Sequence, residues 1–244
     1  MKWQKIKKIN VGVVLFALGF NVFAADLTRI DIEQTLKTAD SAHIADLRRK
    51  DFRRLDLSKL DFRHADLWGT DLRDVNLDES DLSNLNLDLT VMTRIHLARA
   101  NLANSSIFGV SMMDSDLSGA NLSGSRFIAN LERANLNHAN LTNANWGVDM
   151  KNQPMGLMRV TLNSANLSYA NLTNANLNKG LLKRVDLSHA NLTNADLSGA
   201  DLTSARFDHA NFTGANLNGT RFSVIKDKTI FNGAINLNSA IFEE

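Results

Sequence analysis

The sequence predicts an all-β fold in which very short strands are stacked into a coil, and three observations carry this prediction. A large apolar residue, here termed the centre, recurs at every fifth position sixteen times in succession from Phe52 to Phe127. The residue two positions before each centre is usually small, most often Ala. The two residues after the centre are mostly polar or Gly. A helix repeats every 3.6 residues and a strand every 2, so neither period explains a spacing of five.

Each five-residue unit is best explained as a short strand followed by a corner. A small and a large residue two positions apart face the same side of an extended strand. The polar pair that follows, with its Gly and Asn residues, suits a turn because these residues tolerate a positive φ. One unit cannot bury its large side chain alone. Stacked coils bury the centres along a common axis, while the backbone groups bond to the coils above and below.

Residues 1–25 have the layout of a secretory signal peptide. A basic start, MKWQKIKK, precedes the apolar run VGVVLFALGF and the small residues of VFAA. The apolar run is shorter than the ~20 residues of a spanning helix, so we expect cleavage after Ala24 or Ala25, the alternative being an uncleaved anchor. The expected product is exported, periplasmic or secreted, with no transmembrane span. Loss of the four leader lysines brings the formal net charge from +1 to about −3.

Residues 26–46 lack the period of five and are expected to form an N-terminal capping segment. Ile30, Ile32 and Leu36 fall on one side of a short predicted helix. A bare first coil would expose the apolar axis and unpaired strand edges, which a helix placed across it would cover.

The repeats span residues 47–242, with two irregularities. Leu131 follows Phe127 at a spacing of four instead of five, and the stretch from Trp146 to Leu157 gains one residue before the period resumes. We therefore expect a break at 147–156, GVDMKNQPMG, forming a loop or bulge on one face. The tail TIFNGAINLNSAIFEE is predicted to be a degenerate last coil that closes the other end.

The units resemble the pentapeptide-repeat family, whose pattern is A(D/N)LXX. Between Ala190 and Phe212 the chain reads ANL, ADL, ADL, ARF and ANF at successive units. The resemblance covers about residues 45–242 and implies a right-handed quadrilateral parallel β-helix with four units per coil. It also implies that residues 20 apart stack on one face. The centre and the residue two before it would point inward, and the other three would point outward.

No catalytic constellation is evident in the sequence. It contains no Cys, no nucleophile elbow, no HExxH and no nucleotide-binding loop. Asp61, Asp66, Asp71 and Asp81 are residues of the type that forms acid–base pairs, but their spacing in multiples of five assigns them to the repeat pattern. The protein is therefore predicted not to be an enzyme, with no cofactor and no metal site.

The same stacking of coils predicts ladders on the surface. Tyr169, His189 and His209 share one position in successive coils, which suits either a metal-binding or pH-sensitive row or, more simply, stacked polar surface residues. Two ion pairs are expected across adjacent coils: Asp186 with Arg206, and Asp201 with Arg221.

Four apolar residues form a candidate protein-interaction stripe. Trp68, Phe108 and Ile128 follow a centre at separations that are multiples of 20, with Asp88 in the same row and Leu89 beside it. The resemblance places this row on the outside. Large apolar side chains on a surface of Asn, Asp, Ser and Thr indicate a protein partner or self-association. The alternative is that the N-terminal segment or the 147–156 loop covers them.

The first coils carry a second cluster of interest. The run RRKDFRR at 48–54, with His64, Arg63 and Arg73, is basic but faces acidic neighbours. A solvated charged surface is the simpler interpretation, and a site for an anionic partner is the alternative.

The function predicted from these features is a non-enzymatic exported scaffold or protein–protein interaction module. The resemblance also offers an alternative, because cytosolic relatives bind DNA gyrase by imitating duplex DNA and so confer resistance. That role requires a strongly acidic surface and a cytosolic address, whereas this chain is near −3 and has a leader. An effector delivered into host cells is a further alternative. Direct nucleic-acid binding is not expected, since the chain has no basic surplus.

Overall fold

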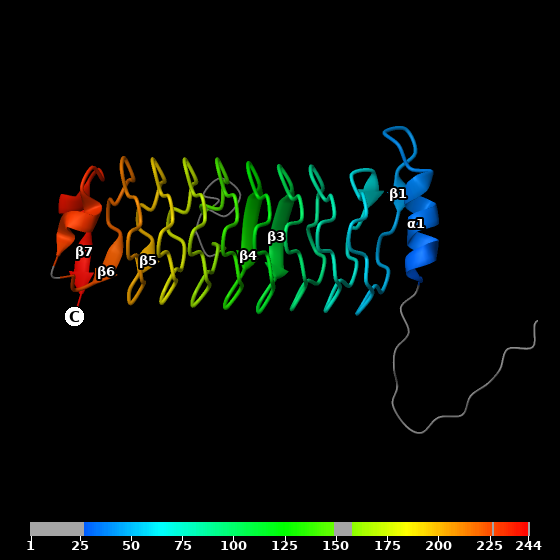
Figure 1. The fold of residues 1–244 in the computed structure, drawn as a ribbon, viewed down its shortest axis with the longest axis horizontal. Helices are drawn as coiled ribbons and strands as arrows, with labels where there is room; N and C mark the ends of the chain where they lie inside the picture. Colours follow the sequence, from blue (N-terminus) through cyan, green and yellow to red (C-terminus); the bar gives the residue numbers. More distant parts are fainter. Residues whose placement is uncertain (1–26, 149–157, 226, 244) are drawn as a thin grey trace, which may run out of the picture.

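The computed structural model describes residues 27–148, 158–225 and 227–243. The predicted leader and its cleavage sites at Ala24 and Ala25 lie outside the described residues. The chain forms a straight rod of stacked coils (Figure 1), with helix α1 (Arg29–Lys37) at one end and strand β7 (Ile241–Glu243) at the other.

Each coil contains four short parallel strands. Residues pair in parallel with residues 20 positions later, and successive pairs along a coil are about five positions apart. The four sides of the first coil show this spacing: Ala45 with Ala65, Asp51 with Asp71, Asp56 with Asn76, and Asp61 with Asp81. The molecule is therefore a four-sided parallel β-helix, as the spacing of five and the resemblance predicted.

Most of these strands are single paired residues, and only a few are longer. The remaining elements are β1 (Ala45–Asp46), β2 (Ala65–Asp66), β3 (Ser106–Ser111), β4 (Arg126–Asn130), β5 (Asp201–Leu202), β6 (Arg221–Ser223), and the short 3-10 helices η1 (Lys228–Phe231) and η2 (Leu237–Ser239).

Nearly every regular corner in the described coils uses a left-handed residue, His64 being an exception. The second residue after the centre has φ of 57° at Asn104, 64° at Gly119 and 56° at Arg184. Gly adopts this conformation at no cost and Asn at little, whereas other residues strain against their own Cβ. This requirement explains why Gly and Asn recur at that position.

The Asn or Asp before each centre stabilises the same corner. The Asn140 side-chain oxygen accepts a hydrogen bond of 3.1 Å from the backbone N–H of Thr142, two positions on. Such side chains also bond along the rod, as Asn121 does when its amide donates to the Asn101 side-chain oxygen at 3.0 Å. The repeat pattern thus satisfies the turn and links neighbouring coils at once.

The centres stack along the axis of the rod. Leu167 and Leu187 are fully buried, and Phe207 in the next coil is partly buried and packs against the same core. The residues that precede these three pair in parallel with one another, so the three lie one above another. Small residues two positions before a centre, such as Ala120, are buried as well. The predicted inward positions are confirmed.

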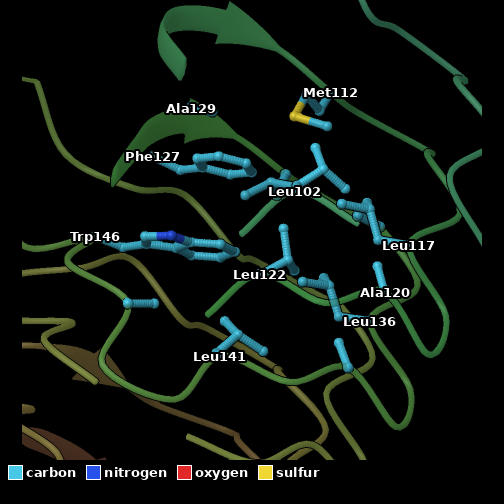
Figure 2. Packing of buried hydrophobic residues seen from close by; sticks show 14 of the residues in the cluster. Leu102, Met112, Leu117, Ala120, Leu122, Phe127, Ala129, Leu136, Leu141 and Trp146 are labelled. Atoms are coloured by element: carbon cyan, nitrogen blue, oxygen red, sulfur yellow. The ribbon is translucent and has the colours of Figure 1, made fainter. Parts of the chain in front are cut away.

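One coil is a residue short, as the sequence predicted. Asp116 pairs with Asn135, one position earlier than the regular spacing would place its partner. Phe127 and Trp146 lie one above the other in the two coils that this short turn connects, with parallel rings 5.0 Å apart at their centroids (Figure 2). The Trp146 indole N–H donates to the Ser125 hydroxyl at 3.0 Å.

The second irregularity is larger than predicted, and the coil that contains it is called the enlarged coil. Asn145 pairs with Asn176 rather than with Ala165, its partner at the regular spacing, so this coil gains eleven residues and not one. The sequence misleads because ten of those eleven residues equal two full periods, so that the stretch up to Leu157 appears to gain only one residue. The structure describes only Gly147 and Val148 of the predicted break, and Leu157 also lies outside the described residues.

Helix α1 lies across the first coil (Figure 1). Thr28 and Asp31 form a capping box at its start, and Ile32 is fully buried against the core. Leu36 is partly buried there, whereas Ile30 is 64% exposed and does not join this apolar side. The Arg29 guanidinium also fastens the helix to the coil, since it donates to the carbonyls of residues 56 and 58 at 2.8 and 3.0 Å.

The opposite end is closed by aromatic packing. Strand β7 pairs with β6 at the regular spacing, with Arg221 opposite Ile241. Phe231 of η1 is buried, 4.9 Å from the Phe222 ring and 6.3 Å from the Phe242 ring between centroids. Within the described residues, no helix is long and apolar enough to cross a membrane.

Candidate protein-interaction surface

The backbone ladder is interrupted at one corner of the rod. In the first coil the N–H groups of Leu47 and Arg49 donate to the next coil at 3.0 Å each. One coil later, no backbone hydrogen bond joins residues 65–69 to residues 85–89, and residues 66 and 86 are not paired. The ladder resumes above this point, where the Leu87 N–H donates to the next coil at 2.8 Å.

A second interruption adjoins the first. Residues 89–92 make no backbone hydrogen bond to residues 108–111, and Val91 does not pair with Ser111. The pairing of β3 with β4 shifts register between Phe108 and Ser111, which marks a bulge. Residues 65–69, 85–92 and 108–111 together are called the open corner.

The side chain of Leu85 accounts for the first interruption. It is buried at the inward position two before a centre, where the adjacent coils place Ala65 and Ser105. A Leu at a position shaped for Ala or Ser needs more room, and packed coils yield by moving apart. The bulge at Phe108 spreads the next pair of coils in the same corner.

A hollow of about 890 Å³ lies between the separated coils. Its walls include Asp66 and Trp68 on one side and Leu85 and Asn86 on the other. Ile44, which lines the hollow, is 53% exposed, and Leu89, elsewhere in the open corner, is 57% exposed. Exposed apolar groups around a concave surface are characteristic of binding sites.

The predicted stripe falls largely within this corner. Trp68 and Phe108 are partly exposed, and Leu89 is the most exposed of the four stripe residues. The Arg49 guanidinium lies over the Trp68 ring, 4.8 Å from its centroid. The structure therefore brings Trp68, Leu89 and Phe108 to one corner.

Ile128 does not belong to this surface, and its predicted exposure is wrong. It is only 2% exposed and pairs with Phe108 in extended strand. The one-residue deletion removes the usual corner here, so the chain continues straight through β4 instead of turning outward. Met158 borders the same small hollow as Ile128 and Gly109, which places the residue following the insertion against this face.

An acidic residue lies in the same row, between Trp68 and Phe108. One carboxylate oxygen of Asp88 is buried and has no hydrogen-bond partner among the described residues. Burial raises the pKa of the Asp88 carboxyl above its ordinary value of 3.8, although bonds from the Phe108 backbone and from Asn86 oppose the shift. A carboxylate held in this way is an unfavourable feature of the isolated protein.

The basic character of the first coils is largely neutralised within the protein. Arg48 donates to both oxygens of Asp46 at 2.8 and 2.9 Å, and this bonding lowers the pKa of Asp46 to about 2. Arg63 and Asp61 form the same arrangement. Arg49 is different, because the described part of the chain offers it no ion pair. The sequence did not reveal this distinction, which depends on Arg49 occupying a corner position rather than the position two after an Asp.

The other predicted ladders are present. Asp186 and Arg206 approach to 3.4 Å and Asp201 and Arg221 to 4.0 Å, which confirms both ion pairs. Tyr169, His189 and His209 stack at centroid distances of 4.6 and 4.9 Å. His138 extends the row at 4.9 Å from Tyr169, a member hidden from the sequence by the enlarged coil.

Among the described residues, no candidate metal site includes these stacked rings. Over the residues that the structure describes, no group of three or more His, Cys, Asp or Glu side chains is placed to hold a metal ion.

The chain belongs to the pentapeptide-repeat family. The model of pentapeptide repeats matches eight copies, at residues 56–94, 95–128, 129–146, 157–179 and 181–223, well over half of the chain. The fold is accordingly the right-handed quadrilateral β-helix of this family, whose members are generally non-enzymatic structural or interaction proteins.

A solved structure of similar fold, that of a QnrB1 variant, agrees with this assignment. A trypsin-treated variant of QnrB1, a plasmid-mediated fluoroquinolone resistance protein, is 21% identical with a TM-score of 0.56, over 72% of this chain and 81% of that one. HetL, a pentapeptide repeat protein involved in heterocyst differentiation regulation in the cyanobacterium Nostoc sp. strain PCC 7120, is 25% identical with a TM-score of 0.30, over 82% and 87%. At these levels the likeness concerns the fold. No curated protein matches the sequence.

Proposed function

We propose that this protein is a non-enzymatic, exported interaction module whose open corner contacts a partner protein. The observation that carries the proposal is the grouping of exposed Leu89 and partly exposed Trp68 and Phe108 at the place where the coils separate. Val224, Ile235 and Ile241 near the C-terminal end are exposed as well. The open corner combines exposed apolar side chains with an adjoining hollow, and both features favour the binding of a partner.

The distribution of charge supports a protein partner over imitation of DNA. Carboxylates of the first coils are bonded to arginines of the same coils, as Asp46 is to Arg48 and Asp61 to Arg63. Alternating charges also run along one edge, where Arg94 donates to Asp74 and Arg133 to Asp114 at 2.7 Å. A DNA mimic needs a continuous negative surface, which such pairing interrupts. Delivery into a host cell would use the same interaction surface and is the alternative destination.

Export is tested by fractionating the producing cells and determining the N-terminus of the product by mass spectrometry. We expect a chain that begins at Ala25 or Asp26 in the periplasm or the medium. A cytoplasmic product that retains Met1 would contradict export and would favour the alternative of a topoisomerase partner. A gyrase supercoiling assay tests that alternative directly.

The interaction is tested by cross-linking in intact cells and recovery of the tagged protein. We expect the double variant Trp68→Ser, Leu89→Ser to lose its cross-linked partner. Tyr169→Ser is the matched control, because Tyr169 is also a large, 51% exposed side chain at a left-handed corner, on a different edge. Equal recovery from both variants would exclude the open corner as the contact surface.

A further inference from the structure

We propose that the open corner binds an extended, acidic segment of its partner as an added β-strand. The inference deepens the proposed function and depends on it, since it states how the partner is recognised. Three features support it: the unpaired backbone groups, the charge of Arg49 and the apolar side chains around the hollow.

The two edges of the interruption carry the hydrogen-bonding groups of a strand. On one edge the N–H groups of Leu67 and Gly69 and the carbonyl of Ala65 lack backbone partners in the described chain, whereas Leu47 and Arg49 use the equivalent N–H groups to bond the next coil. On the other edge, the N–H of Asn86 and the carbonyls of residues 86 and 88 are likewise unpaired with described backbone. Because the equivalent groups in other coils lie in a parallel ladder, these face along the rod into the hollow. Unpaired strand edges recruit extended peptides through main-chain hydrogen bonds.

The charge at the hollow specifies an acidic segment. Arg48 and Arg63, which also line it, are bonded to Asp46 and Asp61. Arg49 lines the same hollow and, among the described residues, has no carboxylate partner. The Arg49 guanidinium is already placed over the Trp68 ring, so a carboxylate from the bound strand gains a charge-assisted hydrogen bond at a lower entropic cost.

The apolar side chains at the hollow match the alternating side-chain directions of an extended peptide. Successive residues of an extended peptide point to opposite sides. One set would lie against Trp68 and Ile44, which line the hollow and offer apolar contact. The open corner therefore offers backbone pairing, one charge contact and apolar contacts within a single hollow.

The test selects random twelve-residue peptides displayed on phage against the purified protein. Selected peptides are synthesised with and without methyl groups on alternate backbone nitrogens, and their Kd is measured by calorimetry. We expect Asp or Glu to be enriched, one methylation phase to weaken binding at least about tenfold, and the other phase to have little effect. Hydrogen exchange at the amides of Leu67, Gly69 and Asn86 should slow at least about tenfold when peptide binds.

Two variants sharpen the result. Arg49→Glu should weaken binding about tenfold or more, whereas Arg54→Glu should not, although Arg54 occupies the equivalent corner one unit later with φ of 63° against 58°. Leu85→Ala should let the coils close, slow exchange at Leu67 and Asn86 without any peptide, and abolish peptide binding.

The outcomes separate this inference from the proposed function. Peptides that bind without protecting these amides, or the absence of any peptide with Kd below about 1 mM, would overturn strand addition while cross-linking that depends on Leu89 still supports the interaction module. Protection of the same amides by the protein's own concentration-dependent dimer would overturn the partner-strand proposal in favour of a second copy. If cross-linking also proves independent of Leu89, both the strand-addition inference and the proposed function are refuted.

Discussion

Phe127 and Trp146 stack face to face, 5.0 Å apart and within 6° of parallel, on the same side of two successive coils at the turn that is a residue short. Leu, Ile, Met or Phe occupies most other centres, and among the described coils only these two stack Phe with Trp. The shorter coil has a different cross-section, and two stacked rings fill it more completely than branched aliphatic side chains would. The rings therefore compensate for the deletion.

Truncating this pair should be costly. Trp146→Ala is expected to lower the free energy of unfolding by about 3–5 kcal/mol, because it leaves a large cavity and removes the indole bond to Ser125. Urea denaturation monitored by circular dichroism measures the change. Leu141→Ala, in the same coil and equally buried, should cost about 2–5 kcal/mol. A Trp146 variant less damaging than the Leu141 variant would show that the ring pair has no special packing role.

Replacing Leu85 should cost less than its burial suggests. Leu→Ala at a buried position ordinarily costs about 2–5 kcal/mol. In Leu85→Ala, closure of the ladder adds backbone hydrogen bonds worth about 1 kcal/mol each, so the net loss should stay below about 2 kcal/mol. Leu77→Ala is the control, since Leu77 is also buried and the ladder is intact on both sides of its strand. Equal losses in the two variants would mean that Leu85 does not hold the coils apart.

The burial of Asp88 predicts an unusual pH dependence. Its folded-state pKa is raised, so the folded protein retains a proton that the unfolded chain has lost, and stability falls as pH rises from the ordinary value of 3.8 through the folded pKa. Asp88→Asn removes this penalty. The variant should be more stable than the parent at pH 7, and its advantage should shrink as pH falls through the folded pKa and be lost below about 3.8.

Asp46 provides the control of opposite sign. Its pKa is lowered to about 2 by Arg48, so its stabilising effect is present above 3.8 and is lost as pH falls toward 2. Asp46→Asn should therefore reduce stability at pH 7. Urea midpoints measured from pH 2 to pH 7 report both effects, and Asp88→Asn behaving like Asp46→Asn would refute the burial argument.

The helix at the first coil should be essential for an ordered end. Ile32→Ser introduces a hydroxyl at a fully buried site and removes apolar contact, which should cost about 2–4 kcal/mol locally. Amide exchange should accelerate in residues 45–66 but not in β5, because the coils of a solenoid interact with their neighbours only. Ile30→Ser is the matched control, since Ile30 is 64% exposed and should leave exchange unchanged. Uniform acceleration along the rod would contradict this account.

Most of the fold follows from the sequence because each unit repeats the same local physics. Centres such as Leu167 need burial, left-handed corners such as Gly119 favour Gly or Asn, and a fixed period places both in columns. The exposure of Leu89 was also predictable by position. Ile128 was not, because its burial depends on a single deleted residue that straightens the corner.

The separation of the coils was equally inaccessible to pattern analysis. It depends on the volume of Leu85 relative to Ala65 and Ser105, whereas Val75 and Ile95, large residues at equivalent positions on another side, leave the ladder intact. Only the packing of the whole corner decides which large residue is accommodated. His138 escaped notice for a different reason, since its alignment with Tyr169 spans the insertion.

The enlarged coil returns to register, with Asn145 paired to Asn176 and the other three sides continuing in line. Length and cross-section are thus independent properties of this molecule. Its cross-section is set by four units of five residues in each coil. A corner can accommodate an extra segment, and whole coils can be added or removed, while the sequence of the other coils stays the same. Such a rod can vary in length and in its inserted loops while its diameter stays constant.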